Sequence, residues 1–172
     1  TNIWSFLIKK VPNGRLTSHL FSYFEPGAQI DMDGPWGTAT LDSSGVRDVV
    51  LIAGGSGLSP MVSIAHAIAR ADEMKNHCVR FYYGARQQDD LFDAALLPDN
   101  PRMELINVLS DPLPGWNGRT GFVHQAVEND FGTTLASQEI YFAGPAAMSG
   151  AIQQMTQAYG VPMTQLHFDE FY

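Results

Sequence analysis

The amino-acid sequence predicts an α/β fold, a doubly wound parallel sheet of five strands that follows a shorter N-terminal segment. From residue 46 onward, strand-like and helix-like stretches alternate, and each parallel connection needs a helix to return the chain to the same edge of the sheet. Residues 49–53, Val-Val-Leu-Ile-Ala, form an apolar run without polar alternation, which is typical of a strand buried on both faces. A glycine-rich stretch follows that strand and leads into a helix-like segment.

The N-terminal segment has a different composition, and we place a boundary near residue 44, which gives domains 1–44 and 45–172. Residues 3–11 are rich in apolar and aromatic types and stop at Pro12-Asn13-Gly14, so they predict a strand and then a turn. Thr17 or Ser18 can cap a short helix that Pro26-Gly27 ends. Residues 28–32 predict a second strand.

The second domain alternates five strands with four helices. Apolar residues three to four positions apart place Met61, Ile64 and Ile68 on one helical face. The expected strands are 49–53, 79–83, 103–109, 139–142 and 165–168, and the expected helices are 60–74, 89–97, 122–129 and 146–159.

Composition excludes several classes of function. The 172 residues include 10 Lys and Arg against 18 Asp and Glu, a formal net charge of -8 with a pI near 4.9. This balance repels phosphate backbones and anionic lipid surfaces, so we expect neither nucleic acid nor a membrane as a partner. Because Cys78 is the only cysteine and no apolar run approaches the roughly 18 residues of a membrane helix, a reducing, cytoplasmic setting fits. The chain opens at Thr1 within an expected strand, which suggests a fragment of a longer protein.

A first glycine-rich loop joins an expected strand to an expected helix, the context that a phosphate-binding loop requires. Its residues are Gly54, Gly55, Ser56, Gly57, Leu58, Ser59 and Pro60. Three glycines let the backbone approach a pyrophosphate, while Ser59 suits an N-cap and Pro60 a first helical position, so free amides would face an anion. The alternative is a plain tight turn. The stretch has neither the Gly-Lys-Ser/Thr ending of a P-loop nor the last glycine of a nucleophile elbow.

A second loop, Gly144-Pro145-Ala146-Ala147-Met148, also joins a strand to a helix. In a parallel sheet both loops would lie at the carboxyl edge, where ligands bind. The alternative is a plain turn with Met148 in the core. Arg86, after another strand, could reach an adenosine ribose or phosphate, or could simply be solvated. Asp89 and Asp90 lie close to it in sequence and would oppose a 2′-phosphate.

Two further stretches carry polar groups of interest. Gly14-Arg15-Leu16-Thr17-Ser18 places a glycine, a cation and two hydroxyls at a helix N-terminus, which is either an anion site or ordinary helix-start chemistry. The chain ends with the carboxylates Asp169 and Glu170 and the aromatics Phe171 and Tyr172. Five scattered histidines with no His-x-x-x-His pair argue against a metal site.

Taken in order, these segments resemble the ferredoxin-NADP reductase superfamily, and within it the NADH-dependent reductase components of multicomponent bacterial oxygenases. The residues that carry the likeness are 8–18, 34–37, 54–60, 83–86, 144–148 and 168–171. The resemblance implies that residues 1–44 are the C-terminal part of an antiparallel β FAD-binding barrel. It also implies that the second domain binds NAD(P).

The resemblance assigns roles to particular residues. Flavin contacts would come from Ile8, Lys9, Val11, Gly14, Thr17 and Ser18, and nicotinamide dinucleotide contacts from residues 55–60, Arg86 and residues 144–148. Phe171 is similar to the terminal aromatic that covers the flavin ring, Tyr172 is the alternative for that role, and Glu170 is a candidate polar contact. Ala143 stands where many relatives carry cysteine, so no thiol would assist hydride transfer here.

The implied activity is hydride transfer from NADH to FAD, followed by passage of single electrons to an iron–sulfur centre that serves an oxygenase. Partners would be NADH, a ferredoxin domain or ferredoxin protein, and an oxygenase component. A [2Fe–2S] centre would lie in a domain outside these residues, because its four-cysteine signature is missing here. Two alternatives are an NADPH-dependent flavodoxin or ferredoxin reductase and a non-catalytic, nucleotide-binding electron-relay subunit.

Overall fold

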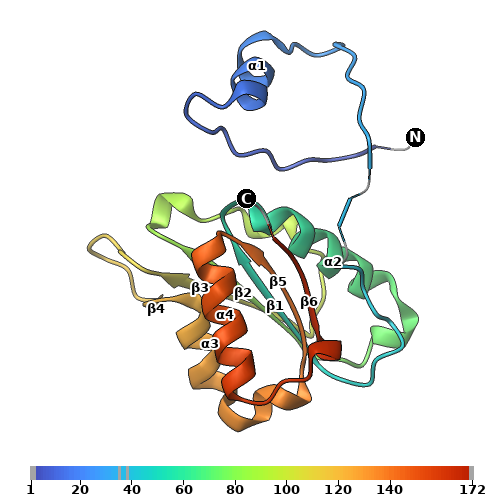
Figure 1. The fold of residues 1–172 in the computed structure, drawn as a ribbon, viewed down its shortest axis with the longest axis vertical. Coiled ribbons are helices and arrows are strands. Elements are labelled where there is room, and N and C mark those ends of the chain that lie inside the picture. Colours follow the sequence, from blue (N-terminus) through green and yellow to red (C-terminus); the bar gives the residue numbers. More distant parts are fainter. Residues whose placement is uncertain (1–2, 35, 38, 171–172) are drawn as a thin grey trace. The chain divides into compact units, whose positions relative to one another are not determined.

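A computed structural model describes residues 3–34, 36–37 and 39–170 (Figure 1). The chain divides into two compact units, Thr1–Gly37 and Thr38–Tyr172. The sequence suggests a boundary near residue 44, but residues 39–42 contact the sheet of the second unit. The backbone N–H of Ala39 donates to Oδ1 of Asp169 (3.3 Å), and that of Asp42 donates to Oη of Tyr141 (3.0 Å).

The second unit is built on one parallel sheet with the strand order β4-β3-β2-β1-β5-β6. The expected parallel, doubly wound arrangement is confirmed, with one strand more than predicted. That strand, β4, has only two polar residues, so it carries no apolar pattern by which the sequence could reveal it. The strands are β1 Val49–Gly54, β2 Val79–Ala85, β3 Met103–Leu109, β4 Arg119–Thr120, β5 Glu139–Gly144 and β6 Leu166–Glu170.

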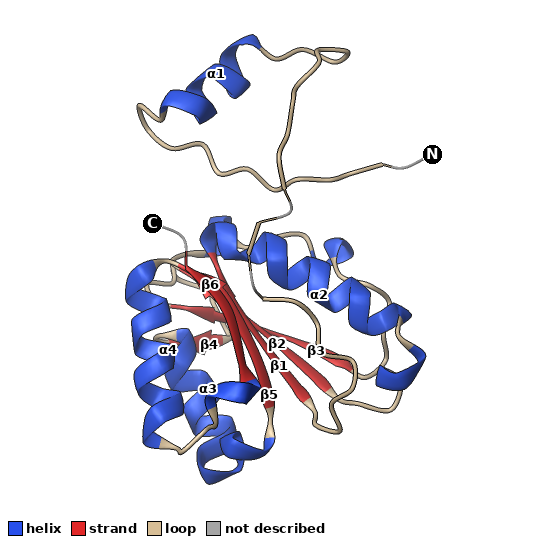
Figure 2. Cartoon of the chain, turned by 45° about the vertical axis from the view of Figure 1, so that its right-hand side comes forward, coloured by secondary structure: helices blue, strands red, loops and turns tan. Residues whose placement is uncertain are grey.

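Helices cover both faces of this sheet, as Figure 2 shows. Helix α2 (Leu58–Arg70) packs on one face, and α3 (Val123–Phe131) and α4 (Ala146–Ala158) pack on the other. All six residues of β1 are buried, because alternate side chains enter the two cores. The apolar run in the sequence is therefore explained by burial on both faces.

The helix expected over residues 89–97 is wrong. Two short 3₁₀ turns occupy this region, Gln88–Asp90 and Ala94–Leu96. An acidic side chain takes a backbone donor that a continuous helix would use, since Asp93 Oδ1 accepts the N–H of Ala95 (2.9 Å), which in a helix would bond to the carbonyl of Leu91. The apolar residues Leu91, Phe92 and Leu97 nevertheless pack against the core beneath α2.

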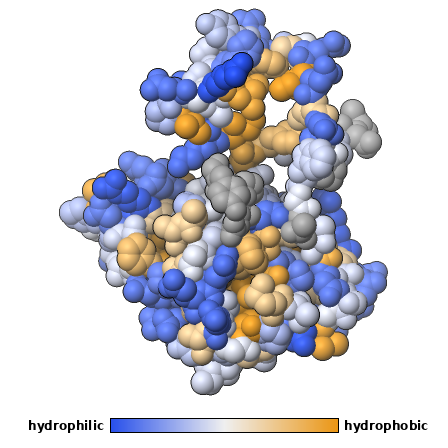
Figure 3. Space-filling model, in the orientation of Figure 1, coloured by the Kyte–Doolittle hydropathy of each residue, from blue (hydrophilic) through white to orange (hydrophobic). Residues whose placement is uncertain are grey.

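The first unit contains one helix, α1 (Arg15–Tyr23), among the residues that the structure describes there. The expected turn is present, with Asn13 at φ 57° and the Gly14 N–H bonded to the Val11 carbonyl at 2.9 Å. The strands expected over residues 3–11 and 28–32 are not formed, because no segment in the described part of this unit pairs with them. Apolar side chains are consequently left on the surface of this unit, as Figure 3 shows. Trp4, Phe6 and Ile8 are among the exposed ones.

No helix within residues 3–34, 36–37 and 39–170 is both long and apolar enough to cross a membrane.

Candidate functional site

The two predicted glycine loops leave neighbouring strands at the same edge of the sheet. Strands β1 and β5 pair in parallel, with Ala53 opposite Ala143, so the stretches that follow them begin side by side. Helices α2 and α4 both start at this edge, directly after the loops. Two positive helix ends therefore lie at the carboxyl edge, where an anionic group is stabilised.

Gly57 is required because the two loops pack against each other, and Gly54 and Gly144 both lie against the side chain of Met148. A Cβ built at Gly57 would lie 2.0 Å from the carbonyl oxygen of Ala143, which leaves no room for any side chain. A Cβ at Gly54 would lie 2.7 Å from Sδ of Met148, and one at Gly144 would lie 2.2 Å from Cε of the same residue. Met148 also packs against the core on the α3 and α4 side of the sheet, as the plain-turn alternative for this loop expected.

The exposed part of the first loop is short. Gly55, at φ 55°, and Ser56 are exposed, and nothing lies within 4 Å of a Cβ built at Gly55. Gly57 is buried and the side chain of Leu58 is 6% exposed within the core, so Leu58 can meet a ligand only through its backbone. Gly55 and Ser56 are thus the residues of this loop that a ligand reaches most directly.

Ser59 is not the N-cap that the sequence suggests. A 3₁₀ turn, Gly55–Gly57, runs directly into α2, so Gly57 is the cap and Ser59 and Pro60 lie inside the first turn. Proline is tolerated there because first-turn amides have no helical acceptor. In the second loop, Pro145 is the cap of α4 and accepts the N–H of Met148 at 2.9 Å, while Pro145 and Ala146 are exposed.

Arg86 lies just beyond β2 and pairs with an acid that the sequence did not single out. Its Nη2 and Nε lie 3.2 and 3.3 Å from Oδ2 of Asp111, which follows β3. The two side chains are 74% and 59% exposed. Asp89 and Asp90 are the acids that the sequence places close to Arg86; Asp90 instead accepts the backbone N–H of Gln87 at 3.1 Å. Because Arg86 and Asp111 are 25 positions apart, only the pairing of β2 with β3 reveals their proximity.

Phe122 is a second residue that sequence reasoning missed. It is the cap of α3, its side chain is 60% exposed, and its ring stacks on His124 with centroids 5.8 Å apart and planes 14° apart. Val123 beside it packs onto β2, since a Cβ built at Gly84 would lie 3.0 Å from Cβ of Val123. A flat aromatic surface is therefore available next to the end of β2. The only signal in the sequence is an aromatic after Gly121 at the start of an expected helix.

Comparison with known proteins now identifies the fold family. The model of a family described as "Oxidoreductase NAD-binding domain" matches residues 51–154, which include both glycine loops. This chain belongs to that family. The two glycine loops of this chain therefore lie at the carboxyl edge of the sheet, which is where dinucleotide-binding sheets bind their ligand.

Relatives with assigned roles are reductases. The NAD-binding chain is 36% identical to the ferredoxin–NAD(P)+ reductase CarAd of Metapseudomonas resinovorans, over 99% of this chain and 51% of that protein. It is 32% identical to the reductase component of the naphthalene 1,2-dioxygenase system of Pseudomonas putida, over 97% and 51%. The chain thus spans about half the length of the curated relatives it matches.

A solved structure agrees with these relatives. The ferredoxin reductase in carbazole 1,9a-dioxygenase superposes with a TM-score of 0.86 at 35% identity, covering 96% of this chain and 50% of that one. A second structure of that reductase, described as its FAD apo form, superposes with a TM-score of 0.78 at 34% identity, over 97% and 48%. The fold resemblance drawn from the sequence is confirmed.

The residues predicted to contact flavin lie in the first unit of the NAD-binding chain. Oγ1 of Thr17 accepts the backbone N–H of Val11 (3.1 Å), and the N–H of Ser18 donates to the carbonyl of Gly14 (2.9 Å). A Cβ at Gly14 would lie 2.5 Å from Oγ1 of Thr17, so glycine is required where the chain turns into α1. Ile8 and Lys9 are exposed. The turn and the helix start expected for an anion contact are present.

The C-terminal strand β6 pairs with β5, and Glu170 lies opposite Gly144 in the register. The backbone of Glu170 is therefore beside the second glycine loop. Phe171 and Tyr172, predicted to stack on a flavin, lie outside the described residues.

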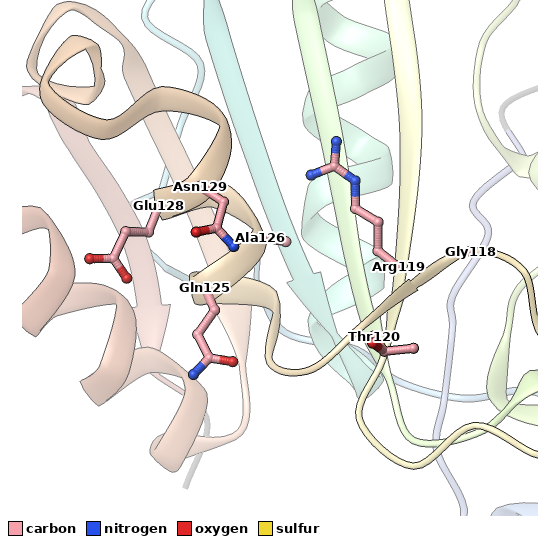
Figure 4. A pocket seen from close by; sticks show the side chains of 7 residues that line it. All are labelled: Gly118, Arg119, Thr120, Gln125, Ala126, Glu128 and Asn129. Carbon is pink, nitrogen blue, oxygen red and sulfur yellow. The ribbon is translucent and has the colours of Figure 1, made fainter.

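A surface hollow of about 520 Å³ lies elsewhere, between β4 and α3 (Figure 4). No predicted site residue lines it; its walls are Gly118, Arg119, Thr120, Gln125, Ala126, Glu128 and Asn129. Nη1 of Arg119 lies 2.6 Å from Oδ2 of Asp130, which also accepts the hydroxyl of Tyr82 at 2.5 Å. The arginine is therefore neutralised by a structural partner, and we assign no ligand to this hollow.

Proposed function

We propose that this chain is the nucleotide-binding part of a reductase in which hydride passes from NADH to FAD and single electrons then pass onward. The acceptor would be the iron–sulfur centre of a ferredoxin domain or ferredoxin protein that serves an oxygenase. The observation that carries the proposal is the contact of two glycine loops at one sheet edge, with Gly55, Ser56, Pro145 and Ala146 exposed there. Similarity to ferredoxin reductases over nearly the whole chain supports it.

In this proposal the chain binds and orients the dinucleotide. The exposed backbone at Gly55 and Ser56 and the starts of α2 and α4 would hold the pyrophosphate, because helix N-termini favour negative charge. NADH supplies the hydride and FAD accepts it, and this transfer requires no acid or base from the protein. Precise placement of the two rings is then the main contribution of the protein to the rate.

We infer NADH rather than NADPH from the pairing of Arg86 with Asp111. An acidic group near the adenosine ribose accepts hydrogen bonds from free hydroxyls, whereas it repels a 2′-phosphate. Arg86 would otherwise be the cation available to that phosphate, but Asp111 already engages its Nε and Nη2. The exposed ring of Phe122 offers the adenine a stacking surface at the same edge.

The flavin part of the proposal rests on the first unit and the C-terminus. Gly14, Thr17 and Ser18, at the start of α1, would contact the flavin pyrophosphate, with Ile8, Lys9 and Val11 near the nucleotide portion. Phe171, or Tyr172 in its place, would cover the flavin ring, with Glu170 nearby. A cytoplasmic location and a [2Fe–2S] partner belong to the proposal as well.

Calorimetric titration of the chain with NADH and, separately, with NADPH tests the dinucleotide site. We expect NADH to bind more tightly. Tighter binding of NADPH would favour a flavodoxin or ferredoxin reductase, and binding of neither would contradict the assignment. Reduction of ferricyanide by NADH in the FAD-loaded protein tests turnover, and its absence would leave only a nucleotide-binding relay subunit.

A further inference from the structure

The loops that follow β2 and β3 are joined beyond the ends of the strands. The N–H of Ser110 donates to the carbonyl of Ala85 (3.0 Å), and the N–H of Asp111 donates to the carbonyl of Arg86 (2.9 Å). Backbone hydrogen bonds therefore join the two loops up to the residue whose carboxylate faces Arg86.

Two residues after Asp111, the backbone of Leu113 is hydrogen-bonded to a side chain instead of to a neighbouring strand. Leu113 lies between Pro112 and Pro114, so it has the only backbone N–H of the three. That N–H donates to Oε1 of Gln88 (2.9 Å), and Nε2 of Gln88 donates to the carbonyl of Leu113 (2.9 Å). A primary amide holds one acceptor and two donors side by side, so Gln88 satisfies both backbone groups of Leu113 at once.

The ion pair between Arg86 and Asp111 is too weak to hold its own geometry. Both side chains are more than half exposed, and exposed ion pairs contribute little because water screens the charges and both side chains lose conformational freedom. The third contact of this carboxylate, from Nε2 of Gln87, is long at 3.5 Å. The backbone must therefore fix the carboxylate. Before Asp111 it is held by the N–H groups of Ser110 and Asp111 themselves. After Asp111 it is held at Leu113, by two bonds from Gln88 at 2.9 Å and a longer one from the N–H of Trp116 at 3.4 Å.

We propose that Gln88 is a positioning residue for cofactor choice: its two bonds to Leu113 hold Asp111 against Arg86 and so keep the arginine from a 2′-phosphate. This inference rests on the proposed dinucleotide function and adds to it a residue that would touch neither the cofactor nor the reacting atoms.

Titration calorimetry with ADP-ribose and with 2′-phospho-ADP-ribose tests the role, because both probes lack nicotinamide. In Gln88→Ala we expect selectivity, the ratio of the two dissociation constants, to shift toward the 2′-phosphate about three- to tenfold, as for the loss of one or two hydrogen bonds. Gln88→Glu keeps the acceptor for the Leu113 N–H but opposes the Leu113 carbonyl, so we expect a shift in the same direction. Gln138→Ala, which removes a side-chain amide bonded to Thr134 and Ser137, should leave selectivity unchanged.

A double-mutant cycle separates positioning from general structure. In an Asp111→Ala background, Gln88→Ala should leave selectivity unchanged, since the carboxylate that Gln88 positions is gone. An equal loss of affinity for both probes, or the same selectivity shift with and without Asp111, would overturn the role of Gln88. If the unmodified chain fails to bind ADP-ribose, the dinucleotide site itself is wrong and this role is overturned with it. Normal ADP-ribose binding with unchanged selectivity in folded Gln88→Ala overturns the role of Gln88 alone.

Discussion

Gly57 and Ala143 meet backbone to backbone, with only 2.0 Å between the carbonyl oxygen of Ala143 and a Cβ built at Gly57. This contact joins the start of α2 to the end of β5. The glycine is therefore needed for the two loops to approach each other, and the ligand-facing residues of both loops depend on it.

Replacement of Gly57 should separate the loops. We expect Gly57→Ala to lower the free energy of unfolding by at least about 2 kcal/mol, because overpacking against rigid backbone cannot be relieved by a side-chain rotation. NADH affinity should fall with it. Thermal unfolding and calorimetry measure the two effects. Gly150→Ala is the matched control, since nothing lies within 4 Å of its Cβ inside α4 and helix propensity should make it stabilising by about 0.5–1 kcal/mol. Wild-type affinity in Gly57→Ala would contradict the importance of the contact.

Removal of the acid beside Arg86 should relax cofactor choice. We expect Asp111→Ala to weaken NADH binding about tenfold, as for the loss of a hydrogen bond to a charged group, and to strengthen NADPH binding because Arg86 is freed. Titration with both cofactors measures the change. Asp89→Ala removes an exposed acid close to Arg86 in sequence and should have little effect. An equal change in both variants would mean that net charge alone sets the preference.

The ring of Phe122 should contribute to NADH affinity by stacking on the adenine. Truncation in Phe122→Ala should weaken NADH binding about five- to tenfold, since stacking on an aromatic is worth about 1 kcal/mol beyond its area. Binding of nicotinamide mononucleotide, which has no adenine, should not change. Met163→Ala, another exposed apolar residue at 71%, serves as the control. Loss of mononucleotide binding would point instead to disruption of the site.

The carboxylate of Asp130 should make stability depend on acid pH. Burial acts to raise the pKa of Asp130, but hydrogen bonds from Arg119 and Tyr82 outweigh it and hold that pKa below its ordinary value. A carboxylate whose pKa is lower in the folded state stabilises the fold above its unfolded pKa, and that stabilisation is lost as pH falls through the folded pKa.

We therefore expect the melting temperature of Asp130→Asn to lie below that of the wild type at neutral pH, with the difference shrinking below about pH 4. Thermal unfolding across a pH series measures it. Asp99→Asn, which removes one negative charge at an exposed position, is measured beside it to separate the effect of net charge from that of the contacts of Asp130. A difference that stays constant into strong acid would show that Asp130 acts through packing rather than charge.

The parts of the fold that the sequence predicts are those with a local pattern. The buried run of β1 and the glycines after it are readable because burial and close approach restrict residue type at each position. Strand β4, with two polar residues, has no such pattern, and residues 3–11 have the composition of a strand without a partner in the described part of the chain. Asp111 and Gln88 were missed for a different reason, since their roles come from contacts across 25 positions that only the pairing of β2 with β3 creates.

The shortness of β4 also protects the sheet. It is the last strand at its side of the sheet, so its outer backbone groups are open to pairing with another chain. The strand has only two residues, and the carbonyl of one of them, the charged Arg119, already accepts the indole N–H of Trp116 at 3.0 Å. A second molecule would find too few hydrogen bonds there to extend the sheet, which makes aggregation through this edge unfavourable even at high protein concentration.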